Sequence, residues 1–169
     1  MRVLSVDQSL SCTAWCVASK ETDGTITVED FGIIKTNKEL TLYQRIIKIR
    51  DALISVIKDN GGIDEVVFEQ LAFGGYGNAS RNLAGLLASV IVGLLDEGLY
   101  TEEEIHLIAP KAAKKILTGN GNASKDLMVE SLPKDLRSRF VEEGYKKTTG
   151  LRDLADSYAI SLGYFKKES

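Results

Sequence analysis

Val3-Leu4-Ser5-Val6-Asp7 opens the chain with a short apolar run that ends in an acidic residue, a pattern typical of a buried β-strand. Two β-rich segments follow, Thr13–Ala18 and Thr25–Ile34, and the turn residues Thr22-Asp23-Gly24 separate them. Three strands joined by short turns predict an antiparallel meander at the start of the fold.

Helices and strands alternate after the meander. Apolar residues at helical spacing predict a helix over residues 41–58, and Val66-Val67-Phe68 predicts a buried strand that ends at Glu69. The other predicted elements are a helix over residues 80–95, a strand over 105–109, a helix from Pro110 to Ile116, a helix capped by Ser124, and a last helix over 151–165. This order predicts one mixed α/β sheet in a single domain, residues 1–169.

The helix over residues 80–95 is apolar almost all round, which predicts a central position. Its most apolar run, Leu83–Leu95, is shorter than the roughly 20 residues that cross a bilayer. No basic-then-apolar signal opens the sequence. We therefore expect a cytoplasmic protein that does not enter a membrane.

Charge is unevenly distributed along the 169 residues, whose net charge is −3. A basic segment runs from Lys111 to Lys147 within this acidic chain. It could contact phosphates locally or could be an ordinary solvated surface of mixed charge. The only two cysteines, Cys12 and Cys16, fall in one predicted strand about 13 Å apart, too far for a disulfide, and we expect both in the core.

Four carboxylates are hard to explain by structure alone. Asp7 and Glu69 each end an apolar strand, while Asp153 and Asp156 share one face of a largely apolar helix. Buried acids need a cation. A salt bridge from Arg152 to Asp156 could supply it, and so could a divalent metal such as Mg²⁺ or Mn²⁺, which takes oxygen ligands. The helix pair alone does not separate these two interpretations.

With these residues in order, the chain resembles the RuvC family of Holliday-junction resolvases along nearly its whole length. The resemblance rests on four segments and on their order. They are Leu4-Ser5-Val6-Asp7-Gln8-Ser9, Val67-Phe68-Glu69-Gln70, the region from Ala109-Pro110-Lys111 to Gly119-Asn120-Gly121-Asn122-Ala123-Ser124-Lys125, and Asp153-Leu154-Ala155-Asp156-Ser157-Tyr158-Ala159-Ile160.

This resemblance implies an RNase H-like fold: a five-stranded mixed sheet, strands 1–3 antiparallel, with helices on both faces. It implies a homodimer that cuts branched DNA to 5′-phosphate and 3′-hydroxyl ends with two Mg²⁺ ions per site, Mn²⁺ also supporting activity. The implied metal ligands are Asp7, Glu69, Asp153 and Asp156. Lys125 would act on the phosphate, Lys114 or Lys115 would match a second functional lysine, and Lys111 would join them in binding DNA. Phe73 would stack on a base, with Tyr76 as a rival, and residues 83–95 would supply either core or dimer interface.

The sequence departs from the family pattern at two places. The first motif continues as Asp7-Gln8-Ser9-Leu10, without the usual glycine, and the loop after Glu69 is rich in glycine. These differences leave the metal chemistry intact but leave strict selectivity for four-way junctions open, so that a looser branched-DNA nuclease is compatible with the sequence. Compact phage-encoded members of the family look similar.

Two other functions remain as alternatives. An actin-like or sugar-kinase ATPase also begins with a strand, an aspartate and a meander, but it needs two such domains and a phosphate-loop glycine that is missing after Asp7. A non-catalytic junction-binding scaffold would need none of the four carboxylates, because acids placed against phosphate weaken binding.

Overall fold

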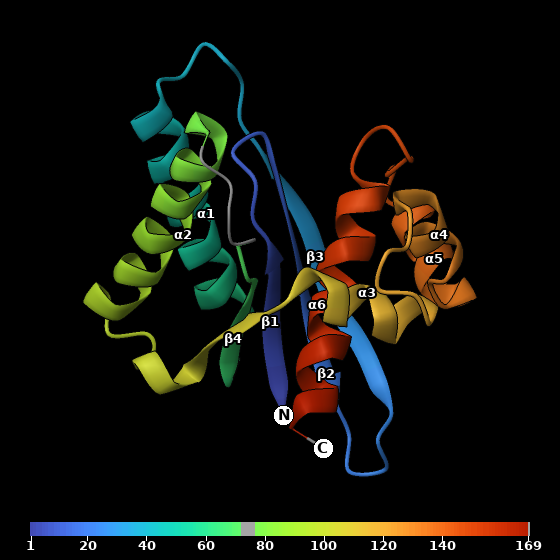
Figure 1. Ribbon diagram of the computed structural model, residues 1–169. Coiled ribbons are helices and arrows are strands. Elements are labelled where there is room, and N and C mark those ends of the chain that lie inside the picture. Colours follow the sequence, from blue (N-terminus) through green and yellow to red (C-terminus); the bar gives the residue numbers. More distant parts are fainter. Residues whose placement is uncertain (72–76, 169) are drawn as a thin grey trace.

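The computed structural model describes residues 1–71 and 77–168. Its centre is a five-stranded sheet in the order β3-β2-β1-β4-β5 (Figure 1). The strands are β1 (Arg2–Asp7), β2 (Cys12–Lys20), β3 (Ile26–Lys35), β4 (Glu65–Glu69) and β5 (Ile105–Ile108). The first three pair antiparallel, whereas β4 pairs parallel with β1 and β5 parallel with β4. The predicted mixed sheet with an antiparallel meander is confirmed.

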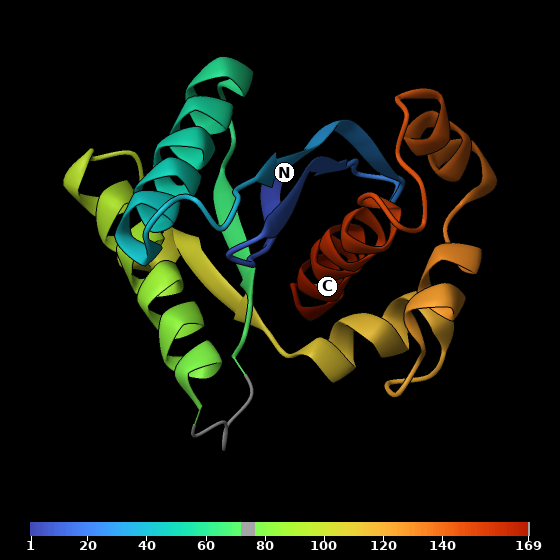
Figure 2. The ribbon, with the colours of Figure 1, turned by 90° about the horizontal axis from the view of Figure 1, so that it is seen from above.

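Helices cover both faces of this sheet. They are α1 (Leu42–Asn60), α2 (Asn78–Asp96), the 3₁₀ turn η1 (Glu102–Glu104), α3 (Pro110–Thr118), α4 (Lys125–Glu130), α5 (Lys134–Glu142) and α6 (Leu151–Lys167). Seen from above, α1 and α2 lie on one side of the sheet and α3 to α6 on the other (Figure 2). The apolar residues accordingly form two cores, one on each face. The sequence did not predict α5 or η1.

The central helix is α6, which packs on β1 and β2. Most of its circumference is buried, including Leu154, Ala155 and Ile160. Gly150 precedes it with φ +112°, a conformation that L side chains rarely adopt, and a Cβ there would clash with Ile33. This glycine therefore sets the point at which α6 starts against β3, and with it the position of the acids in the first turns of α6.

The predicted central position of the apolar helix is wrong, because that helix is α2, which lies beside α1 on one side of the sheet (Figure 2) and is only partly buried. Leu86, Leu87, Val90 and Leu94 are buried in the core that α1 and α2 share with the sheet, whereas the opposite face of α2 is exposed and Val92 is 53% exposed. Among the described residues, α2 is also the one helix that is long and apolar enough to cross a membrane, a test that core helices of soluble proteins pass too.

Candidate functional site

Two of the four acids lie at neighbouring strand ends. Val6 pairs with Phe68 in the parallel ladder between β1 and β4, and each strand ends at the next residue, Asp7 and Glu69. Carboxyl ends of parallel strands meet at one edge of a sheet. The two carboxylates predicted from separate motifs are therefore side by side.

The other two acids come from α6. Asp153 lies in its first turn and Asp156 one turn further on the same face, with side chains 26% and 12% exposed. Both acids raise the pKa of Asp7, so they lie close to the end of β1, on which α6 packs. The structure thus brings together the four carboxylates that the sequence predicted, from three separate elements.

The acids raise one another's pKa. Burial is the largest cause of a pKa of Asp7 well above its usual range, and the carboxylates of Asp156, Glu69 and Asp153 raise it further. Burial, followed by Asp156, also raises the pKa of Glu69. Burial raises the pKa of Asp156, although Lys125 and Lys114 oppose that rise. The cluster therefore holds more negative charge than its surroundings balance, which is typical of a cation site.

Lys125 is the cation in closest contact with the cluster. Its Nζ lies 3.8 Å from Asp153 Oδ1 and 3.9 Å from Asp156 Oδ2, and 57% of its side chain is exposed. Of the two lysines offered by the sequence for a second role, Lys114 lowers the pKa of Glu69 and of Asp156. Lys111 and Lys115 are exposed on the same helix, α3.

A tight turn delivers Lys125 to the acids. Gly119 ends α3 with φ +79°, and a Cβ on Gly121 would lie 3.0 Å from the Lys111 carbonyl oxygen. The turn therefore packs directly on the first turn of α3. Ser124 then caps α4, its hydroxyl accepting a hydrogen bond of 3.1 Å from the Leu127 N–H. The glycines act through this packing, which keeps Lys125 close to α6.

The salt bridge that the sequence offered between Arg152 and Asp156 is wrong. Arg152 instead donates from Nε and Nη2 to Asp126 Oδ1, at 3.1 and 2.7 Å. Asp126 follows Lys125 on α4, and Arg152 precedes Asp153 on α6, so this ion pair joins the two helices beside the cluster. Arg152 is therefore not the cation that balances Asp156, which instead lies 3.9 Å from Lys125. Of the two interpretations of the helix pair, this favours the divalent metal over the salt bridge.

The two cysteines have different environments, which corrects the prediction that both are core residues. Cys16 is fully buried, and its Sγ lies 3.0 Å from Ser157 Oγ. Cys12 is only partly buried, and its thiol contacts Asp153 Oδ2 at 3.5 Å. Burial and the Asp153 charge raise the pKa of Cys12 to about 11, which keeps it a neutral thiol donor. The alternating pattern of β2 does not single out Cys12, because its contact with Asp153 depends on how α6 packs on the strand.

The donor set of the cluster suits a hard divalent cation, because it consists of carboxylate oxygens. Asp7, Glu69, Asp153 and Asp156 would hold such an ion. Within residues 1–71 and 77–168, no three His, Cys, Asp or Glu side chains are already arranged around a common point for a metal. Binding would therefore require these carboxylates to draw together. The expected stacking residues, Phe73 and Tyr76, lie outside the described residues.

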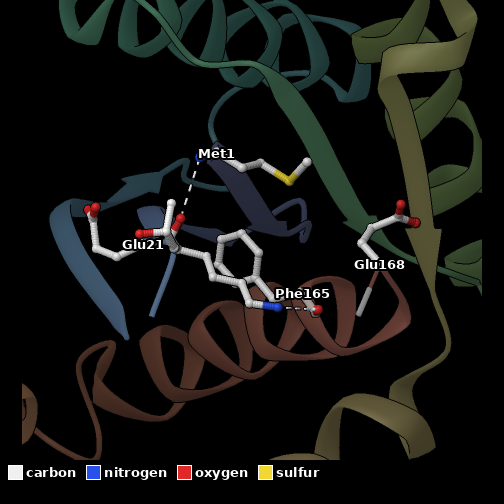
Figure 3. A pocket seen from close by; sticks show the side chains of 6 residues that line it. Met1, Glu21, Phe165 and Glu168 are labelled. Atoms are coloured by element: carbon white, nitrogen blue, oxygen red, sulfur yellow. Dashed lines mark hydrogen bonds between the residues drawn. The ribbon is translucent and has the colours of Figure 1, made fainter. Parts of the chain in front are cut away.

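A cavity at the other end of α6 belongs to no part of this cluster. It measures about 220 Å³ and is lined by Met1, Lys20, Glu21, Thr22, Phe165 and Glu168 (Figure 3). Lys20 Nζ donates to the Phe165 carbonyl oxygen at 3.1 Å and so ties the end of α6 to β2. The chain ends meet here, away from the acidic ends of β1 and β4 (Figure 1).

Asp7→Asn is expected to stabilise the metal-free protein at neutral pH. The native pKa of Asp7 is raised, so its ionisation destabilises the folded state as pH rises from the unfolded value, about 3.9, through the native one. The gain should be about 1.4 kcal/mol for each pKa unit between the two states and should vanish near pH 4. Thermal unfolding in EDTA from pH 4 to 8 measures it, with Asp59→Asn on the exposed face of α1 as control. Equal melting temperatures for wild type and Asp7→Asn at every pH would contradict it.

A sheet of this order, with acids at the ends of β1 and β4 and on the helix that crosses them, defines an RNase H-like fold. A family model described as "Crossover junction endodeoxyribonuclease RuvC" matches residues 3–161. The RuvC of Neorickettsia sennetsu is 36% identical over 76% of each chain, and that of Ehrlichia chaffeensis is 26% identical over 99% of each. The chain belongs to the RuvC family of crossover junction endodeoxyribonucleases.

Solved structures agree on the fold. Thermus thermophilus RuvC in complex with a Holliday junction substrate has a TM-score of 0.73 at 20% identity and covers 99% of this chain and 94% of its own. The yeast mitochondrial Holliday junction resolvase Ydc2 has a TM-score of 0.71 at 14% identity, covering 98% and 78%.

Proposed function

We propose that this chain is a cytoplasmic enzyme of DNA recombination and repair that cleaves four-way junctions, and other branched DNA, to 5′-phosphate and 3′-hydroxyl ends. Residues 1–169 would act as one nuclease domain. The observation that carries the proposal is the convergence of four acids from β1, β4 and α6, with Lys125 within 4 Å of two of them. Membership of the RuvC family supports the substrate class.

Each residue has a distinct part in the proposed reaction. Asp7, Glu69, Asp153 and Asp156 would hold two Mg²⁺ ions, and Mn²⁺ would replace them. Ions held by these carboxylates would lower the pKa of a coordinated water and would stabilise charge on the oxygens at phosphorus. Lys125 would offset the charge that develops on the phosphate, and Lys114 would assist it from α3. Lys111 and Lys115 would hold DNA further along the same helix.

Cleavage of labelled four-way, fork and plain duplex DNA tests this function. With Mg²⁺ or Mn²⁺ we expect the branched substrates to be cut, and we expect no cleavage in EDTA. The nicks should be resealed by a ligase, which requires 5′-phosphate and 3′-hydroxyl ends. A strong preference for the four-way junction over the fork would make the protein a strict resolvase. Tight junction binding without cleavage would favour the scaffold alternative, and ATP binding without cleavage would favour the ATPase.

We also propose that the protein is a homodimer through the exposed face of α2. Gly85, Ala88 and Val92 lie on that face at helical spacing, and all three are exposed. Small residues allow two helices to approach closely, and burying an exposed apolar face drives association. A second copy of the chain, packed α2 against α2, would cover this surface.

Val92→Glu is expected to convert the dimer to a monomer without unfolding it, because the side chain is 53% exposed in the single chain. Burying the new charge in the interface would cost several kcal/mol. Sedimentation at micromolar concentration should show twice the 18.5 kDa chain mass for wild type and the single mass for the variant. Val141→Glu, 52% exposed on α5, is the matched control and should remain dimeric. A wild type that sediments only at 18.5 kDa would contradict the dimer.

A further inference from the structure

Gln8, the residue after Asp7, has a buried side chain that is tied to the opposite strand end. It is only 5% exposed. Its Nε2 donates a hydrogen bond of 2.6 Å to the Glu69 carbonyl oxygen, and its Oε1 accepts one of 3.2 Å from the Glu69 N–H. Both peptide hydrogen-bonding groups of Glu69 are therefore satisfied by one side chain.

This pairing continues the sheet where the backbone cannot. The paired residues of β1 and β4 end at Val6 and Phe68, and after Asp7 the chain turns towards β2. A primary amide presents the same donor and acceptor as a peptide group. Gln8 thus adds one further step to the ladder at the position of Glu69.

The surroundings of Gln8 make this link rigid. The turn that follows is closed by Thr13, whose Oγ1 accepts from the Ser9 N–H at 3.1 Å and donates to the Ser9 carbonyl oxygen at 2.6 Å. On the other flank of β4, the Gln70 N–H donates to the Ile108 carbonyl oxygen at 2.8 Å. Glu69 is therefore held between a closed turn and β5.

The link opposes a repulsion. Asp7 and Glu69 are like-charged neighbours at strand ends, and their mutual repulsion tends to separate the two strands. Hydrogen bonds made inside a buried, low-dielectric environment resist such separation more strongly than exposed ones. Two bonds on Glu69 itself fix the backbone from which its carboxylate extends.

We propose that Gln8 is a positioning residue that holds Glu69 beside Asp7 and so sets the affinity of the acid cluster for divalent metal. The inference rests on the proposed metal-dependent function. Gln8 itself touches neither metal nor DNA in this role. This role explains why a glutamine stands after Asp7, at the position where the sequence departs from the family pattern.

Gln8→Met tests the proposal, because methionine has a similar length but neither donor nor acceptor. Tyr100→Phe is the matched control, since it removes one buried hydrogen bond, Tyr100 Oη to the Ile63 carbonyl oxygen at 3.2 Å, at the other end of the β4 segment. Mn²⁺ titration followed by electron paramagnetic resonance gives the metal affinity without any nuclease assay. Melting temperatures in EDTA report folding separately.

We expect Gln8→Met to weaken Mn²⁺ binding by roughly 10- to 100-fold, the range typical of outer residues that orient metal ligands. Tyr100→Phe should lower the melting temperature to a similar extent but leave Mn²⁺ affinity within about twofold of wild type, because it touches no ligand. Gln8→Asn keeps the amide on a side chain one methylene shorter, and we expect it to weaken binding as well.

Wild-type affinity in Gln8→Met, or an equal loss in Tyr100→Phe, would overturn the proposal. Failure of both Gln8 variants to fold in EDTA would overturn it in favour of a purely structural role. A wild type that binds no Mn²⁺ would instead remove the proposed metal site, and this inference with it. Failure of the function and failure of the Gln8 role are thus distinguishable.

Discussion

Single-turnover cleavage of a four-way junction by Asp7→Asn is expected to fall at least roughly 10³-fold, which corresponds to about 4 kcal/mol of the activation barrier. Asparagine has nearly the same shape as aspartate but carries no charge, so the cluster loses a metal ligand and keeps its packing. The same variant should be more stable than wild type in EDTA, because Asp7 is surrounded by like charges. Loss of activity with a gain of stability is the behaviour of a functional acid.

Binding separates this effect from a loss of substrate recognition. Junction affinity in EDTA should be unchanged or slightly tighter in Asp7→Asn, since one negative charge facing phosphate is gone. Asp59→Asn, exposed on α1, should cleave like wild type. Cleavage by Asp7→Asn within tenfold of wild type would contradict the assignment of Asp7.

Neutralising Lys114, Lys115 and Lys125 together to glutamine is expected to weaken junction binding and to flatten its salt dependence. Each phosphate contact contributes about 0.9 to the slope of log K against log salt, so three lost contacts lower its magnitude by about 2.7. The three side chains lie on α3 and at the start of α4, and two of them, Lys114 and Lys125, act on acids of the cluster. Fluorescence anisotropy between 50 and 300 mM salt measures the slope.

A control with the same change in net charge isolates position from charge. Lys48 on α1 and Lys166 and Lys167 near the end of α6 are exposed and lie away from the acid cluster. Their neutralisation should leave the slope within about one of wild type. An equal decrease of the salt slope in the two triple variants would mean that DNA binding depends on the overall charge of the protein rather than on the surface formed by α3 and α4.

The parts of the fold that depend on local pattern could be predicted from the sequence. The meander follows from apolar runs separated by turn residues, and the two strand-end acids follow from where those runs stop. Parallel pairing of β1 with β4 then brings Asp7 and Glu69 together. The i, i+3 spacing of Asp153 and Asp156 is equally local, because it fixes a shared helix face.

Partners chosen by tertiary packing could not be predicted in the same way. Arg152 had an acid one turn away on its own helix, yet it pairs with Asp126 from α4, because the packing of α4 on α6 offers both guanidinium donors to one carboxylate. The partial burial of α2 depends on its place beside α1 at one side of the sheet, which the helical pattern does not specify. The role of Gln8 could not be predicted either, because its partner is the backbone of Glu69, 61 residues further along the chain.

The proposed metal site is tested most directly by an anomalous difference map of crystals soaked in Mn²⁺. We expect peaks within coordination distance of the carboxylate oxygens of Asp7, Glu69, Asp153 and Asp156, and their loss in crystals of Asp7→Asn. Peaks elsewhere on the protein, with none at these four acids, would contradict it and leave the cluster without the chemistry proposed for it.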